Sequence, residues 1–208
     1  MTRSPPAQGA FYTVLSLVLA SASPRRQEAL RLLGLEFEIL RPKRAEPQPL
    51  SGEEPADYAL RAAKFKALAA AQARPGAIVL GADTVVALEG EILGKPRDKR
   101  HALDMLLLLS GKSHVVISAC CCRLPDGTIR HTAGEARVYF FPWPRDVLAA
   151  YAAADEVLDK AGAYAIQGQG AFLAQRIEGS VSAVVGLPMT QLVSLLSELG
   201  IIRAHTAL

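Results

Sequence analysis

The stretch SASPRR, which begins at Ser21, places two serines and two arginines where a helix is expected to start. Ser21 and Ser23 are both suitable helix N-caps, and Pro24 suits the first helical position because an N–H there would have no partner. The first turn of a helix presents free N–H groups and the positive end of the helix dipole, so it favours anions. Arg25 and Arg26 add two cations, which is unfavourable for the helix alone but suits a bound polyphosphate. The alternative is that both arginines are simply solvated.

One aspartate is the best candidate in the chain for a general base or a metal ligand. Asp83 lies in GADTVV after the apolar run 78–80, and Gly81 allows a close backbone approach. We predict that a strand ends there, where α/β folds gather their ligands. The alternative is an aspartate that hydrogen-bonds its own turn. The segment GKPRD adds Lys95, which returns to the same end as Asp83 if a turn at 89–90 folds the chain back.

A lysine interrupts an otherwise small-residue face of the alanine-rich helix predicted over 55–73. Lys66 shares that face with Ala59, Ala62, Ala63 and Ala70 at helical spacing. Such a lysine either extends its ammonium along the surface to water, which is the commoner explanation, or points at something negative.

The elements that must position these residues alternate between strands and helices. Besides 55–73, helices are expected over 24–33, 98–109, 144–153 and 188–199. Strands are expected over 13–20, 36–40, both sides of a polar interruption within 77–96, and in a hairpin of 113–124 and 128–141; 41–54 is a loop, and short strands lie within the glycine-rich stretch 162–186. This order predicts an α/β fold with a mixed sheet.

The first apolar segment has a second interpretation. The run 11–20, followed by Ala20-Ser21-Ala22, also imitates a secretory signal peptide with its cleavage site. Cleavage after Ala22 would discard a strand that the sheet pattern needs. We therefore favour the buried strand, and we expect only residues 1–10 to form a disordered tail.

Composition narrows the function classes. The chain has 208 residues with 50% hydrophobic content, enough for a sizeable core, and its net charge of +3 is too small to indicate nucleic-acid binding. No apolar run has the length that a membrane span requires. The adjacent cysteines 120–122 are expected to fill a strand, and the four histidines, which show no metal-ligand spacing, are expected to be surface or structural.

Taken together and in order, several motifs resemble the Maf family of nucleoside triphosphate pyrophosphatases over residues 14 to about 200. They are SASPRR, GADTVV, GKPRD, LSGKSHVVISA, DKAGAYAIQG and GSVSAVVGLPM. The resemblance implies a cytoplasmic, usually dimeric enzyme that needs Mg²⁺ or Mn²⁺ and binds neither nucleic acid nor membrane. It implies a single catalytic domain over 11–208, with two lobes around a cleft and an elongated mixed sheet related to the inosine triphosphate pyrophosphatases. The reaction it implies is cleavage of a nucleoside triphosphate into a monophosphate and pyrophosphate.

The resemblance also assigns residues. Asp83 matches the family's proton acceptor, and Arg26, Lys66 and Lys95 match positions expected to hold the polyphosphate. Glu46 matches an acidic position thought to lie by the metal or the catalytic water, so Asp83 and Glu46 are the expected metal ligands. The acidic pair usual at that place is Ala45-Glu46 in this chain, so a role that needs the first carboxylate is not expected here.

Three further positions resemble the subgroup that acts on dTTP and UTP. Arg25, Thr84 and Gln167 stand where the subgroup for 7-methyl-GTP tends to have tryptophan, glutamine and glutamate. A neutral amide can both donate to and accept from a pyrimidine edge, whereas a carboxylate suits a cationic methylated guanine. The substrate-binding residues expected are therefore Ser21, Ser23, Arg25, Arg26, Thr84 and Gln167. The alternatives are a 7-methyl-GTP enzyme and a nucleotide-binding regulator of cell division with little turnover.

Overall fold

The computed structural model describes residues 9–41 and 45–205. Its strands are β1 (Phe11–Thr13), β2 (Leu17–Ala20), β3 (Glu38–Ile39), β4 (Ile78–Leu88), β5 (Glu91–Leu93), β6 (Ser113–Arg123), β7 (Ile129–Phe140), β8 (Ala174–Gly179) and β9 (Ile202–Ala204). Its helices are α1 (Pro24–Leu32), α2 (Pro55–Ala71), α3 (Lys99–Leu109), α4 (Arg145–Ala152), α5 (Val181–Val185) and α6 (Met189–Glu198), with short 3₁₀ segments η1 (Asp155–Asp159), η2 (Ala161–Ala163) and η3 (Gly168–Phe172).

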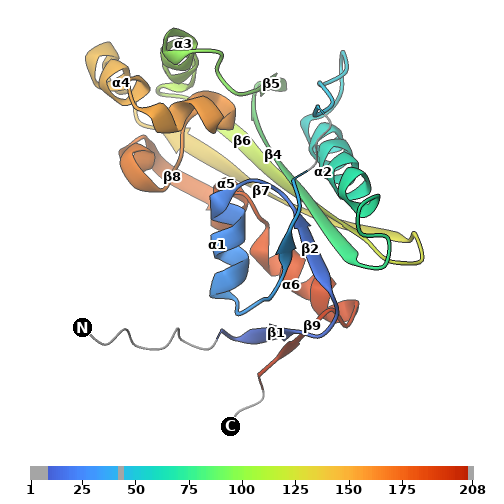
Figure 1. Ribbon diagram of the computed structural model, residues 1–208. Helices are drawn as coiled ribbons and strands as arrows, with labels where there is room; N and C mark the ends of the chain where they lie inside the picture. Colours follow the sequence, from blue (N-terminus) through green and yellow to red (C-terminus); the bar gives the residue numbers. More distant parts are fainter. Residues whose placement is uncertain (1–8, 42–44, 206–208) are drawn as a thin grey trace.

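The described residues form one large mixed sheet and one small sheet (Figure 1). The large sheet has the order β3-β2-β4-β6-β7-β8, and β5 pairs with β4 outside this path. β2 runs parallel to β3 and β4, whereas the pairs from β4 to β8 are antiparallel. The predicted α/β class with a mixed sheet flanked by helices is confirmed.

Side-chain alternation along β4 distributes the helices over the two faces of the sheet. Val79 and Val85 pack with the alanines of α2 on one face. Leu80 and Ala82 pack on the opposite face with residues of α1 and α6. Farther along that second face, Val86 joins a core cluster with α3 and α4. The central strand β4 is therefore buried on both sides, and α1 and α2 lie across it from each other.

Most predicted elements are present, with shorter ends. The helices α1, α2, α3, α4 and α6 and the hairpin of β6 and β7 are confirmed, and so is the turn that joins β4 to β5. The strand predicted over 36–40 is only two residues long, and 162–186 contains one strand, β8, beside 3₁₀ turns and α5. Cys120, Cys121 and Cys122 are buried in β6, as expected for residues that fill a strand.

The strand predicted over 13–20 is wrong in its extent. It consists of β2, inside the large sheet, and a separate β1 that pairs with β9 near the other end of the chain. One apolar run contributes strands to two different sheets, because its first part pairs with β9 and its second part with β4. Residues 1–8 of the predicted tail and residues 42–44 of the predicted loop lie outside the described residues. Ala10, the last residue of the predicted tail, contacts the segment after β9, since its carbonyl accepts a hydrogen bond from His205 N at 3.0 Å.

Within the described part of the chain, every helix falls short of the length and apolarity that crossing a membrane requires.

Candidate active site

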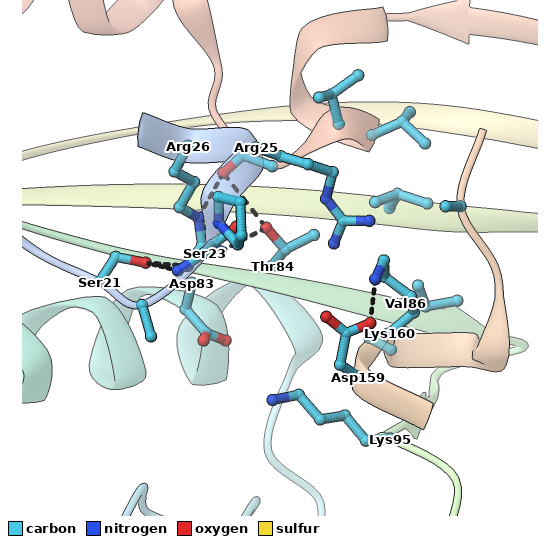
Figure 2. Close-up of a pocket in the computed structure, with 18 of the residues that line it drawn as sticks. Ser21, Ser23, Arg25, Arg26, Asp83, Thr84, Val86, Lys95, Asp159 and Lys160 are labelled. Atoms are coloured by element: carbon cyan, nitrogen blue, oxygen red, sulfur yellow. Dashed lines mark hydrogen bonds and ion pairs between the residues drawn. The ribbon is translucent and has the colours of Figure 1, made fainter. Parts of the chain in front are cut away.

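A cavity of about 650 Å³ lies beside the middle of β4 (Figure 2). β2 pairs with β4 as far as Ala20 and Gly81, and β5 pairs with β4 only from Val86 onward. Between these points the edge of β4 has no strand partner among the described residues on that side. Asp83 and Thr84 point to opposite faces, as successive strand residues do, yet both line the cavity because it wraps around this open edge.

This arrangement corrects the prediction for Asp83. β4 does not end at Asp83 but continues without interruption to Leu88, because β6 pairs with it throughout and places Ala119 opposite Asp83. The opening comes from the end of β2, not of β4. All ten residues predicted for the site line the cavity: Ser21, Ser23, Arg25, Arg26, Glu46, Lys66, Asp83, Thr84, Lys95 and Gln167.

The face of β4 toward α2 carries a lysine between two carboxylates. Lys66 Nζ lies 2.6 Å from Asp83 Oδ1 and 3.1 Å from Glu46 Oε1. Lys66 and Asp83 are buried, whereas Glu46, from the loop before α2, is exposed. Lys66 therefore points at negative groups, and the alternative of a lysine extended to water is wrong.

Gly81 brings Lys66 this close to Asp83. A Cβ on Gly81 would lie 2.2 Å from Ala63 O and 2.6 Å from Ala67 N, so only a glycine lets α2 lie directly on β4. The close approach predicted at Gly81 is made by a helix rather than by a ligand.

On the opposite face, Arg26 is held by three hydrogen bonds. Its Nε donates to Gly186 O at 2.9 Å, its Nη2 to Thr84 Oγ1 at 2.9 Å and its Nη1 to Ser21 Oγ at 3.4 Å. Arg26 is buried, so the alternative of a solvated arginine is wrong for this residue. The three bonds join α1, β4 and the segment after α5 at one wall of the cavity.

The start of α1 is not capped as the sequence suggests. Ser23 occupies the N-cap position, but its side chain makes no capping hydrogen bond. Ser21 Oγ instead accepts from Ser23 N at 3.2 Å and from Arg26. The first turn therefore keeps N–H groups without a side-chain cap beside the cavity, which suits an anion.

The far end of the cavity contains a cluster of charges that sequence reasoning missed. Figure 2 shows the Arg25 guanidinium extending toward Lys160 and Asp159, which form an ion pair with each other. Burial lowers the pKa of Arg25, and the negative charges of Asp159 and Glu156 oppose that shift. Lys160 Nζ also donates to Glu156 O at 3.2 Å, and Tyr164 completes this wall.

These missed residues lie in DKAGAYAIQG and just before it, a segment of 3₁₀ turns without helical or strand periodicity. For Asp159, Lys160 and Tyr164 the only signal was their presence in the motif, which named no role, and Glu156 lies outside the motif.

Whether a divalent cation fits this site depends on the chemistry of its two carboxylates, Asp83 and Glu46. Among the described residues no group of three or more His, Cys, Asp or Glu side chains is placed to hold a metal ion. Asp83 and Glu46 are nevertheless hard oxygen donors that share one ammonium as a neighbour. Mg²⁺ commonly binds through one or two carboxylates together with phosphate oxygens and water. The pair therefore fits a cation that arrives with a phosphate substrate.

Comparison with known proteins identifies the family. The sequence profile of the family described as Maf-like protein matches residues 16–199. The chain belongs to the Maf family. Proteins named dTTP/UTP pyrophosphatase are similar over most of this chain. The relative from Nitratidesulfovibrio vulgaris is 48% identical over 95% of this chain and 94% of its own length. The relative from Geobacter sulfurreducens is 46% identical over 88% and 96%, and that from Aquifex aeolicus 40% identical over 90% and 97%.

Solved structures show a partial likeness. The Ham1 protein of Staphylococcus aureus aligns over 61% of this chain and 72% of its own, with a TM-score of 0.44 and 16% identity. A Mycobacterium abscessus protein described as a nucleoside-triphosphatase and dITP/XTP pyrophosphatase aligns over 62% and 76%, with a TM-score of 0.41 and 18% identity. The family assignment rests on the profile and the sequence relatives.

Proposed function

We propose that this Maf protein hydrolyses dTTP and UTP to the nucleoside monophosphate and pyrophosphate. The observation that carries the proposal is the Lys66–Asp83–Glu46 cluster in a cavity whose walls also supply Lys95, Arg25, Arg26 and the uncapped start of α1. The names of the relatives support the same reaction and the same two substrates.

The charges of the cavity suit this reaction. A triphosphate brings several negative charges, so attack on it requires their neutralisation and stabilisation of the departing pyrophosphate. Arg26 and Lys95 would contact the polyphosphate, with the N–H groups of the first turn of α1 beside them. Asp83 and Glu46 would hold Mg²⁺ or Mn²⁺, which supplies charge stabilisation at the phosphate oxygens when bound.

Asp83 is the residue proposed to accept the proton of the attacking water. The water oxygen bonds to the α phosphorus, the bond from that phosphorus to the α,β-bridging oxygen breaks, and pyrophosphate leaves. Lys66 fixes the position of the Asp83 carboxylate through their 2.6 Å contact. A carboxylate in such a position can take the proton directly from the water.

Two residues of the cavity wall, Arg25 and Gln167, are proposed to set the preference for dTTP and UTP. Both line the cavity, and the Arg25 guanidinium can offer a planar pair of donors. The Gln167 amide can donate to and accept from a pyrimidine edge. The predicted homodimer, the cytoplasmic location and the two-lobed single domain stay predictions.

The test is a substrate panel with the purified full chain. Release of pyrophosphate is measured for dTTP, UTP, CTP, 7-methyl-GTP, ATP and GTP with Mg²⁺, Mn²⁺ or EDTA, and the nucleotide product is identified by chromatography. We expect metal-dependent formation of monophosphate, fastest with dTTP and UTP. A preference for 7-methyl-GTP would overturn the specificity but not the chemistry. Formation of diphosphate and orthophosphate, or binding without turnover, would overturn the reaction itself.

A further inference from the structure

The hydroxyl of Thr84 belongs to a chain of hydrogen bonds that runs away from the cavity. Thr84 Oγ1 lies 2.7 Å from Ser118 Oγ, and Ser118 Oγ lies 2.6 Å from Ala183 O. Thr84 and Ser118 are register partners on β4 and β6, so their side chains share one face of the sheet. Ser118 is fully buried and does not line the cavity.

The direction of each hydrogen bond in this chain can be deduced. A carbonyl oxygen can only accept, so Ser118 must use its one hydrogen to donate to Ala183 O. Ser118 then has only lone pairs for Thr84, so the hydrogen between the two hydroxyls, which are 2.7 Å apart, comes from Thr84. The other acceptor near Thr84, Gly186 O, is farther away at 3.4 Å. Arg26 Nη2 donates to Thr84 Oγ1 at 2.9 Å. The order of donation is therefore Arg26 to Thr84 to Ser118 to Ala183 O.

The same series of hydrogen bonds uses the hydroxyl hydrogen of Thr84, so Thr84 has no hydrogen left to donate to a nucleotide. Its hydroxyl instead fixes one end of the Arg26 guanidinium, while Gly186 O fixes Nε at 2.9 Å. Gly186 has φ 135°, a region that favours glycine, and a Cβ there would lie 3.6 Å from Arg26 Nε. Arg26 is thus aimed by groups on β4, β6 and α5, and hydrogen bonds in such a series strengthen one another.

We propose that Ser118 is a positioning residue for phosphate binding, and that Thr84 acts through Arg26 rather than by donating a hydrogen bond to the substrate. The inference rests on the proposed function in taking Arg26 as a phosphate ligand. It gives a role to a buried serine of the motif LSGKSHVVISA, and it places the Thr84 hydroxyl one hydrogen bond away from the proposed phosphate ligand Arg26.

The experiment is a double-mutant cycle on Ser118 and Thr84. Ser118→Ala, Thr84→Val and the double variant are compared with the full wild-type chain in two assays. These are kcat/KM for dTTP and the Kd for inorganic tripolyphosphate by titration calorimetry, which needs no turnover. In each single variant we expect kcat/KM to fall and Kd to rise by about tenfold, the usual scale of a lost hydrogen bond to a charged group. The double variant should show little further change in either value.

Two controls separate positioning from general destabilisation. Ser113→Ala removes a hydroxyl from the same strand at a residue for which no side-chain hydrogen bond is found among the described residues, and it should keep wild-type values. Thr84→Ser keeps the hydroxyl and should rescue the affinity that Thr84→Val loses. Thermal unfolding is followed in parallel, because a purely structural role would lower the melting temperature without changing the tripolyphosphate Kd.

The outcomes distinguish the inference from the proposed function. Suppose that the wild type hydrolyses dTTP. If Ser118→Ala then keeps the wild-type values, as Ser113→Ala should, or if the losses of the two single variants add up in the double variant, the inference alone is overturned. If the wild type binds tripolyphosphate without hydrolysing nucleotides, the proposed function fails and the affinities still decide the inference. If Ser118→Ala does not fold, Thr84→Val against Thr84→Ser decides it. A wild type that hydrolyses dTTP but does not bind tripolyphosphate overturns the inference and leaves the proposed function in place.

Discussion

Asp83 both contacts the buried Lys66 ammonium and is proposed to accept a proton, and Asp83→Asn separates these two roles. The amide keeps the shape of the side chain but cannot act as the base. We expect kcat for dTTP to fall by about a hundredfold or more while the chain still folds. Pyrophosphate release measures the first effect and thermal unfolding the second.

The matched control is Glu38→Gln. It replaces an exposed carboxylate that pairs with Arg74 at 2.7 Å, and this residue does not line the cavity. It should keep wild-type turnover, because surface ion pairs contribute little. Near-full activity of Asp83→Asn would remove this residue from the role of base.

Lys95 tests the proposed binding of the polyphosphate by cationic side chains of the cavity. It follows β5 and lines the cavity with Asp83, from a different segment of the chain. In Lys95→Ala we expect KM for dTTP to rise and inhibition by added pyrophosphate to weaken, each by about tenfold, because a charge contact to phosphate is lost. Steady-state kinetics with pyrophosphate as inhibitor measure both. Unchanged values would refute the assignment.

For individual residues, the sequence predicted which side chains would line the cavity but not which hydrogen bonds they would form. Asp83 and Lys66 were predicted from their types and spacing, and Glu46 from the family resemblance, and the three meet in the cavity. Ser23 occupies the predicted N-cap position, but its side chain makes no capping hydrogen bond, and Ser21 Oγ accepts from Ser23 N and Arg26 instead. Ser118 was missed because its partners, Thr84 and Ala183, are supplied by segments far away in the chain.

Among the elements, the contact of α2 with β4 sets the position of Lys66, and Gly81→Ala tests it. The new Cβ would meet backbone atoms of α2, which cannot move as a flexible side chain can. We expect a loss of about 2 kcal/mol or more in the free energy of unfolding, and a fall in kcat as Lys66 moves away from Asp83. Urea unfolding and pyrophosphate release measure these.

Gly76→Ala is the matched control for this contact. Gly76 immediately precedes the same buried stretch of chain, and a Cβ there would meet nothing within 4 Å. Its effect on stability should stay within about 0.5 kcal/mol. Equal effects of the two substitutions would mean that α2 can adjust without cost.

The elements also show where sequence patterns stop being informative. The polar residues of GADTVV were expected to interrupt a strand, but a strand can carry buried polar side chains when neighbours satisfy them. Lys66 satisfies Asp83, and Arg26 with Ser118 satisfies Thr84. The hydrophobic pattern indicated the strands and helices, whereas the open edge of β4 depends on the length of its partner β2, which the pattern around Asp83 does not contain.

For the molecule as a whole, the mixed α/β class could be predicted because strands and helices alternate along the chain. The pairing of β1 with β9 could not, since it joins Phe11 to Ala204 across almost the full sequence through three residues on each side. Short strands of this kind have no periodicity to detect. A different set of long-range contacts, with Phe140 and Tyr164, buries His114 of β6, which the sequence placed only as surface or structural.

The stability of the whole molecule should depend on pH through His114. His114 is 1% exposed, its Nε2 lies 2.7 Å from Tyr164 Oη, and its ring makes edge-to-face contacts with the rings of Phe140 and Tyr164. Burial lowers the pKa of His114 to about 4 from its usual 6.5. Between these values the unfolded chain binds a proton that the folded chain does not, so stability must fall as the pH drops from 6.5 toward 4.

We expect this histidine to contribute a loss of about 2 kcal/mol in the free energy of unfolding between pH 7.5 and 5.0. Urea unfolding of the wild type and of His114→Phe at the two pH values isolates the contribution, because the other titrating groups are common to both chains. The variant loses the Tyr164 hydrogen bond and should be less stable at pH 7.5, but the gap should narrow or reverse at pH 5.0. His131→Phe, at an exposed histidine of β7, should keep the wild-type pH dependence. An equal pH dependence in wild type and His114→Phe would show that His114 becomes protonated inside the fold without penalty.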